Sequence, residues 1–165
     1  MPDATSDPID YRDALLALAG DRDPLTILAG TPYAVAALCA NAASAPTAAP
    51  GEWSPADVVG HLVDAEMTLG FRWRQTLAAD EPTLPGYDEK RWAALPKPPL
   101  DELAITFRVL RTHNLHLLRH LDAEQLRRVG VHSEQGPETL DVMIRKLAGH
   151  DLAHLDQLTN AVQGG

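Results

Sequence analysis

Two histidines four residues apart, His150 and His154, have the spacing of paired metal ligands on a helix. On a helical wheel, with about 100° per residue and Leu140 at zero, His154 falls at about 320°, His150 at about 280° and Asp151 at about 20°. All three therefore turn toward the apolar stripe of their helix. Burying such groups costs several kcal/mol unless a partner satisfies them. The partner is either a metal ion or a hydrogen-bonding group in the core.

A third histidine, His61, lies on another predicted helix and also faces inward. With Val58 at zero, His61 falls at about 300°, on the edge of that helix's apolar stripe. Two helices would thus turn three imidazoles toward a shared core. Three protein ligands with one free position is the arrangement of a catalytic metal site, whereas structural zinc sites usually have four ligands. The pattern therefore favours an open metal site over a closed structural one.

The elements that must position these histidines are predicted to be helices throughout, because apolar residues recur at spacings of three and four and no alternating β-branched run occurs. Thr31-Pro32 should kink or restart the second helix, since proline removes a backbone donor. The long connection over 80–99 contains five prolines and suggests a crossover. Four long helices in one domain predict an all-α four-helix bundle. The expected helices span residues 9–18, 25–43, 54–79, 100–121 and 137–162, with a loop over 130–137.

The start of the helix that carries His61 has strong local signals. Ser54 suits the N-cap, Pro55 the first helical position, and Asp57 can complete a capping box while favouring the positive helix end. Apolar residues from several of these helices should then form the core, namely Trp53, Leu62, Leu69, Phe107, Leu117, Leu147 and Leu158.

Three further polar residues are candidates for contacts with a substrate. Arg72 lies on the same helix edge as His61 and could pair with an anionic group, although a surface ion pair is the simpler interpretation. Asn114 falls inside the apolar stripe of its helix, so its amide needs either backbone partners or a ligand. Asp151 faces inward between the two paired histidines.

Other ionisable residues have a simpler expected role. His113, His116 and His120 share the polar face of their helix, where solvation is expected and a second, adventitious metal site is the alternative. His132 is expected in an exposed loop, although that loop could fold near the mouth of the metal site. Asp64 is expected to be solvated, with orientation of a ligand histidine as the alternative.

Composition excludes several classes of protein. The 165 residues fit one domain, and 45% are apolar. A net charge of −9 argues against a nucleic-acid surface or an anionic membrane anchor. No apolar run approaches the roughly 20 residues of a membrane helix, and no signal peptide is recognisable at the start. With Cys39 as the single cysteine, a cytoplasmic location is expected.

The stretches EWSPADVVGHLVDAE over 52–66 and GHDLAHLDQ over 149–157 resemble the DinB/YfiT-like superfamily of bacterial four-helix-bundle proteins. A weaker match covers 130–140, and the resemblance extends over about 25–162. It implies a bundle with a long crossover between its second and third helices, and a divalent ion, nickel or zinc, held by His61, His150 and His154. Many members have another histidine where this chain has Ala153, which is not a ligand position. The resemblance also implies a possible homodimer.

The resemblance further implies a thiol-dependent S-transferase that acts on small electrophiles with bacillithiol, mycothiol or glutathione. A metal in an open site can hold a thiol as thiolate at neutral pH, and Arg72 could pair with a carboxylate of that thiol. Two alternatives stay open: a metal-dependent hydrolase with Asp151 or Asp64 as general base, and a non-catalytic, stress-related metal-binding protein. Because imidazole must be neutral to bind a metal, binding is expected to weaken below about pH 6.

Overall fold

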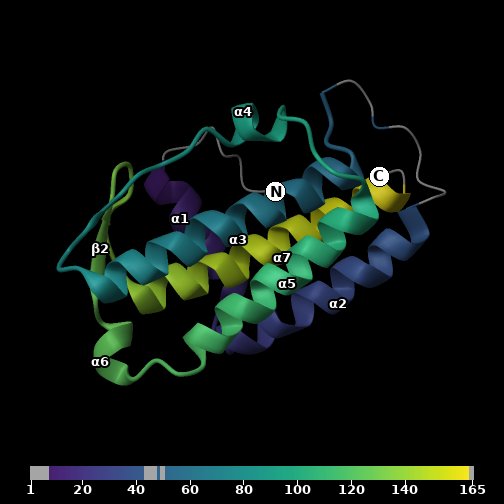
Figure 1. Ribbon diagram of the computed structural model, residues 1–165. Coiled ribbons are helices and arrows are strands. Elements are labelled where there is room, and N and C mark those ends of the chain that lie inside the picture. Colours follow the sequence, from purple (N-terminus) through teal and green to yellow (C-terminus); the bar gives the residue numbers. More distant parts are fainter. Residues whose placement is uncertain (1–7, 43–47, 49–50, 164–165) are drawn as a thin grey trace.

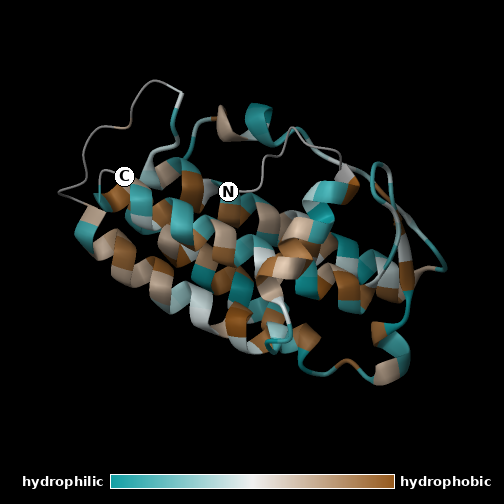
Figure 2. Ribbon diagram, turned by 180° about the vertical axis from the view of Figure 1, so that it is seen from behind, coloured by the Kyte–Doolittle hydropathy of each residue, from teal (hydrophilic) through white to brown (hydrophobic). Residues whose placement is uncertain are grey.

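Four long helices form a bundle in the computed structural model, which describes residues 8–42, 48 and 51–163 (Figure 1). They are α2 (Pro24–Asn41), α3 (Pro55–Ala78), α5 (Leu100–Leu118) and α7 (Leu140–Gln163). A shorter helix, α1 (Pro8–Ala19), packs along α7. Hydrophobic and hydrophilic positions alternate along these helices (Figure 2), as expected for amphipathic segments with one buried face. The predicted four-helix bundle is confirmed.

The long crossover between the second and third bundle helices is also confirmed. Figure 1 shows α3 and α5 running in the same direction, so the chain must return along the bundle between them. The return segment contains β1 (Thr83–Leu84) and the short helix α4 (Glu89–Ala93). A tight turn can join only antiparallel neighbours, and this explains the length of the connection.

A small sheet at one end of the bundle corrects the expectation that the chain is helical throughout. Its strand order is β1, β2 (Val129–His132) and β3 (Gly136–Thr139), with β1 parallel to β2 and β2 antiparallel to β3. The loop expected over 130–137 is therefore largely a hairpin that follows the short helix α6 (Ala123–Leu126), and α7 begins at Leu140. These strands are too short for an alternation of apolar and polar residues to be recognisable in the sequence.

The start of α3 has the capping interactions that the sequence predicts. Ser54 accepts a hydrogen bond from the Asp57 backbone, and the Asp57 side chain accepts one from the Ser54 backbone. This reciprocal capping box satisfies two backbone donors that a helix otherwise leaves unpaired.

The expected restart of the helix at Thr31-Pro32 is wrong, because α2 continues through Pro32, and a kink there stays a prediction. Proline has no N–H, so it cannot bond to the carbonyl four residues earlier, that of Leu28. Arg111 from α5 supplies the missing donor, with its Nη1 atom 2.8 Å from the Leu28 oxygen. The side chain thus occupies the position that proline leaves open.

Arg111 is the centre of a buried polar network inside the bundle. Its guanidinium group contacts both oxygens of Asp151 on α7 at 2.6 and 3.0 Å and Glu66 on α3 at 2.8 Å. The Thr31 hydroxyl of α2 lies 2.6 Å from the same Asp151 carboxylate. All four bundle helices therefore meet at one cation, and apolar clusters pack toward both ends of the bundle.

Among the described helices, one is long and apolar enough, by length and composition, to cross a membrane. This is α2, whose mean hydropathy is 1.2 over its 18 residues. The sequence-based expectation that no apolar run approaches that length is corrected accordingly. In the structure α2 packs along α5 and α7 as part of the bundle.

Replacing Arg111 tests the network directly. Arg111→Met leaves two buried carboxylates without a cation, so the free energy of unfolding should fall by about 3–5 kcal/mol. Urea denaturation followed by circular dichroism measures this change. Arg108→Met, at an exposed position on the same helix, is the matched control and should change stability by no more than about 0.5 kcal/mol. Equal losses in the two variants would show that the network does not stabilise the bundle.

Candidate metal centre

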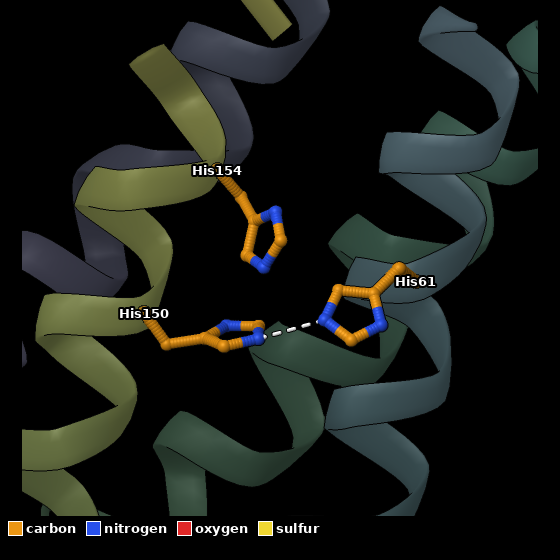
Figure 3. A group of neighbouring side chains, drawn as sticks. All are labelled: His61, His150 and His154. Carbon is orange, nitrogen blue, oxygen red and sulfur yellow. Dashed lines mark hydrogen bonds between the residues drawn. The ribbon is translucent and has the colours of Figure 1, made fainter. Parts of the chain in front are cut away.

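The structure brings His61 of α3 together with His150 and His154 of α7 inside the bundle (Figure 3). One nitrogen atom from each ring lies within 4.8 Å of the others, and all three side chains are buried. The Nε2 atoms of His61 and His150 are 2.8 Å apart. Three imidazole nitrogens therefore converge on one small volume.

The orientation of His154 suits a metal ligand. Its Nδ1 lies 2.8 Å from the Oε1 atom of Gln157, an oxygen that can only accept, so Nδ1 carries the proton and Nε2 keeps its lone pair. This Nε2 is buried without a hydrogen-bond partner among the described residues and points toward the gap between the other two rings (Figure 3). A polar partner that fixes the tautomer of a ligand histidine is typical of metal sites.

An aromatic side chain closes one side of the triad. The Trp53 ring stacks on His154 with 6.2 Å between ring centroids and meets the edge of His61 at 5.2 Å. Such an apolar neighbour limits water at the site and strengthens electrostatic interactions there.

Burial keeps the three histidines neutral. It lowers the pKa of His61 to about 3 and that of His154 to about 4, and it lowers the pKa of His150 well below its usual value. The neighbouring histidines lower the pKa values of His61 and His150 further. Neutral imidazole is the form that binds a metal. These lowered pKa values predict that protons compete with the metal nearer pH 4 than the pH 6 expected for ordinary imidazoles.

The residues present fit a divalent ion better than they fit a hydrogen-bonded core. The contact between His61 and His150 leaves His154 Nε2 and His150 Nδ1 buried and unpaired among the described residues. An ion at the point of convergence would satisfy His154 Nε2. Three imidazoles suit zinc and nickel among the common divalent metals.

The triad adjoins a cavity of about 590 Å³, a size suited to a small molecule. Of the three histidines only His150 is among the lining residues, so it is the point where the cavity reaches the triad. Trp53 and Gln157 line the wall close to that point. The remaining walls come from α1, α3, the crossover, the β2–β3 hairpin and α7.

Of the three candidate substrate contacts, only Arg72 lines the cavity. Asp151 is fully buried and holds Arg111, which corrects its expected roles in substrate binding and as a general base. Asn114 is also turned into the network, where its amide donates to the Glu66 side chain and backbone and accepts from Arg74. Both residues face the bundle interior, as the helical wheel predicts. Their hydrogen bonds, however, are made with other protein groups and not with a ligand.

The cavity also contains one residue that was expected to be exposed and three that the sequence pattern did not single out. His132 is buried on β2 and lines the cavity, which corrects its expected place in an exposed loop. Tyr11 of α1, Tyr87 of the crossover and Lys146 of α7 line it as well. No local signal marks them, because their positions depend on how α1 and the crossover pack. His113 and His116 of α5, and His120 just after its end, are exposed as expected.

A model of the DinB superfamily matches residues 25–158, and the chain belongs to that superfamily. A Bacillus cereus protein described as a "Putative metal-dependent hydrolase" is 33% identical over 112 residues, 67% of this chain. A Bacillus anthracis protein with the same description is 31% identical over 112 residues. The match spans 65% of each relative's own length, just under two thirds.

A solved structure has the same fold. YfiT from Bacillus subtilis, described as a probable metal-dependent hydrolase with an unusual four-helix bundle topology, superposes with a TM-score of 0.78. It is 22% identical in sequence, and the match covers 86% of this chain and 85% of YfiT. At this level of identity the likeness establishes the bundle and its topology.

Metal analysis of protein purified without a histidine tag tests the triad. The wild type should hold close to one zinc or nickel ion per chain, while His61→Ala and His154→Ala should lose it. Gln157→Ala should weaken binding about 10- to 100-fold, because His154 loses the partner that fixes its tautomer. His113→Ala is the exposed control and should bind as the wild type does. Full metal content in His61→Ala would refute the assignment.

Acid should destabilise the metal-free protein in a defined range. Unfolded histidines take up protons below about pH 6.5, whereas the buried histidines do so only near pH 4 or below. The unfolded state therefore binds more protons between these values, and stability falls as the pH drops through them, by about 1.4 kcal/mol per pH unit for each such histidine. Thermal unfolding at several pH values measures the slope. It should be shallower in His61→Asn but unchanged in the exposed control His113→Asn, and equal slopes in both would contradict the argument.

Proposed function

We propose that this protein is a metal-dependent enzyme that acts on a small molecule in the cavity, with hydrolysis as its reaction. The observation that carries the proposal is the position of His150, which belongs to the triad and also lines the cavity. A ligand in the cavity can thus reach the metal centre. The relatives described as metal-dependent hydrolases support this choice of reaction.

Each residue has a definite role in this proposal. His61, His150 and His154 hold the ion, Gln157 fixes the His154 tautomer, and Trp53 restricts water at the triad. A divalent ion in an open three-histidine site supplies Lewis acidity, which polarises a carbonyl and lowers the pKa of a coordinated water or thiol. Zinc or nickel fits this donor set.

The proton acceptor that hydrolysis requires must come from the cavity wall. Asp151 and Glu66 are the buried carboxylates closest in sequence to the histidines of the triad. Both are bound by Arg111. Asp64 is partly buried, with its pKa raised by burial, but is not among the residues that line the cavity. The carboxylates that do line the cavity are Asp88, Glu89 and Glu134. We therefore expect the general base to be one of these three.

The shortage of free carboxylates beside the triad favours a second candidate, a thiol-dependent S-transferase. A thiol brings its own nucleophilic atom and needs only ionisation, so its reaction requires no protein carboxylate at the metal centre. The comparisons favour hydrolysis, and the thiol proposal rests on the site chemistry and on the sequence resemblance. A metal-binding protein without catalytic activity is the third possibility.

A substrate panel separates these functions. Zinc- or nickel-loaded protein is assayed with activated esters, amides and small electrophiles, each with and without bacillithiol, mycothiol and glutathione. Hydrolysis predicts thiol-independent cleavage that falls at least about 100-fold in His154→Ala. His113→Ala, which leaves the triad intact, should retain full activity. Turnover only with a thiol would establish the S-transferase instead, and stoichiometric metal without any turnover would leave the non-catalytic function.

A further inference from the structure

The cavity contains a buried cation without an anionic partner. Arg72 is only 8% exposed and lines the cavity, yet none of the described carboxylates forms an ion pair with it. Within the part of the chain that the structure describes, its one hydrogen bond is from Nη2 to the backbone oxygen of Pro85, at 2.5 Å, and its Nε is buried without a partner. A buried guanidinium group with free donors is costly unless an anion occupies the adjacent space.

The contrast with Arg111 shows that Arg72 is incompletely compensated. Burial opposes the charge of both, but the paired Asp151 and Glu66 outweigh it and raise the pKa of Arg111. Burial lowers the pKa of Arg72, although Tyr87 and three glutamates act in the opposite direction at longer range. Arg111 is thus satisfied within the protein, while Arg72 retains the capacity to bind an anion.

A second unpartnered donor lines the same cavity. The hydroxyl group of Tyr11 on α1 is buried without a hydrogen-bond partner among the described residues, and burial raises the pKa of this group, which keeps it protonated. Arg72, Tyr11 and Tyr87 all line this one cavity of about 590 Å³. A guanidinium and a phenol hydroxyl group together match the oxygens of a carboxylate.

The surrounding charges favour a group with a single negative charge. Lys146, the other buried basic side chain that lines the cavity, is already neutralised by Glu138 at 2.6 Å, and Lys90, which also lines it, is exposed to solvent. Glu89 and Glu134 also line the cavity, and they would repel a dianion such as phosphate. Among the described residues, Arg72 is thus the one buried cation of the cavity that lacks an ion pair, and its acidic neighbours favour a monoanion.

His132 adds a neutral donor in the same region. Its Nδ1 accepts hydrogen bonds from the backbone N–H groups of Glu134 and Gln135, so the proton of the neutral ring lies on Nε2. Burial and the charges of Arg72 and Lys146 lower the pKa of His132 to about 4, which keeps the ring neutral at physiological pH. A neutral donor assists anion binding without adding a second charge.

We infer that Arg72 and Tyr11 form a subsite for a carboxylate of the substrate, set apart from the metal centre within the same cavity. The inference rests on the proposed function, because the substrate is expected to reach the metal centre at His150 while its carboxylate binds Arg72. The substrates are therefore small carboxylic acids that carry a second, reacting group, rather than neutral molecules.

Paired probes test this subsite on the full-length, zinc-loaded protein. The probes are hydroxamic acids of increasing chain length that end in a carboxylate, each matched to one that ends in a carboxamide. Their dissociation constants are measured by isothermal titration calorimetry. At the best chain length the carboxylate should bind about 10- to 100-fold more tightly than the amide, as expected for a charge-assisted contact in a buried site.

The variants identify the groups responsible. Arg72→Gln should abolish the preference for carboxylate over amide, and Tyr11→Phe, which removes only the hydroxyl group, should reduce it about 2- to 10-fold. Arg72→Lys, which keeps the charge, should retain part of it and guards against loss of folding in Arg72→Gln. The exposed control Arg108→Gln should retain all of it. A preference that survives Arg72→Gln and disappears in Lys146→Gln would overturn the assignment.

The outcomes for the metal centre and the subsite are distinguishable. If the hydroxamates bind but the carboxylates hold no advantage, the subsite is refuted and the metal centre stands. If no hydroxamate binds, access from the cavity to the metal, on which the proposed function depends, is refuted. Alkanoates and matching alkanamides are then compared on the metal-free protein by nuclear magnetic resonance, and the absence of a carboxylate preference there also refutes the subsite.

Discussion

The pairing of Arg111 with Asp151 and Glu66 is the interaction on which the arrangement of the bundle depends. One guanidinium group from α5 meets carboxylates from α3 and α7 and a backbone carbonyl of α2. Asp151 lies between His150 and His154 in the sequence, so the contact that joins the helices also sets how far α7 is rotated about its axis. The metal centre is thus positioned by a network of buried charges. This network allows little movement of the helices, because a buried charge that lost its partner would destabilise the fold.

The helical periodicity of the sequence was sufficient to predict the bundle, its crossover and the faces of the long helices. Leu62, Phe107 and Leu158 are buried as the wheel positions require, and His61, His150 and His154 converge as expected. These features depend on residues three or four apart, and such spacing is visible in one chain. The outcome for Pro32 was different, because its tolerance within α2 requires Arg111, a residue on another helix.

The cavity could be predicted only in part, for a related reason. Arg72 shares a helix edge with His61, which allowed an inward position, but the surface ion pair that was the simpler interpretation is wrong, because Arg72 is buried. Asn114 and Asp151 were also placed inward correctly, but the wheel could not show whether a ligand or a protein group would satisfy them. That depended on Arg111 and Glu66. Tyr11 and His132 reach the cavity through the packing of α1 and through a short hairpin, neither of which leaves a periodic signal.

The position of α1 separates two parts of the protein that can change independently. The superfamily match begins at residue 25, so α1 lies outside it, whereas all three histidines of the triad lie within it. Yet α1 packs so closely on α7 that a side chain at Gly149 would collide with the Leu15 backbone, and it supplies Tyr11 and Leu15 to the cavity wall. A change in α1 can therefore reshape the cavity wall while leaving the triad intact. The shape of the cavity and the ligands of the metal centre can thus be altered separately, through different parts of the chain.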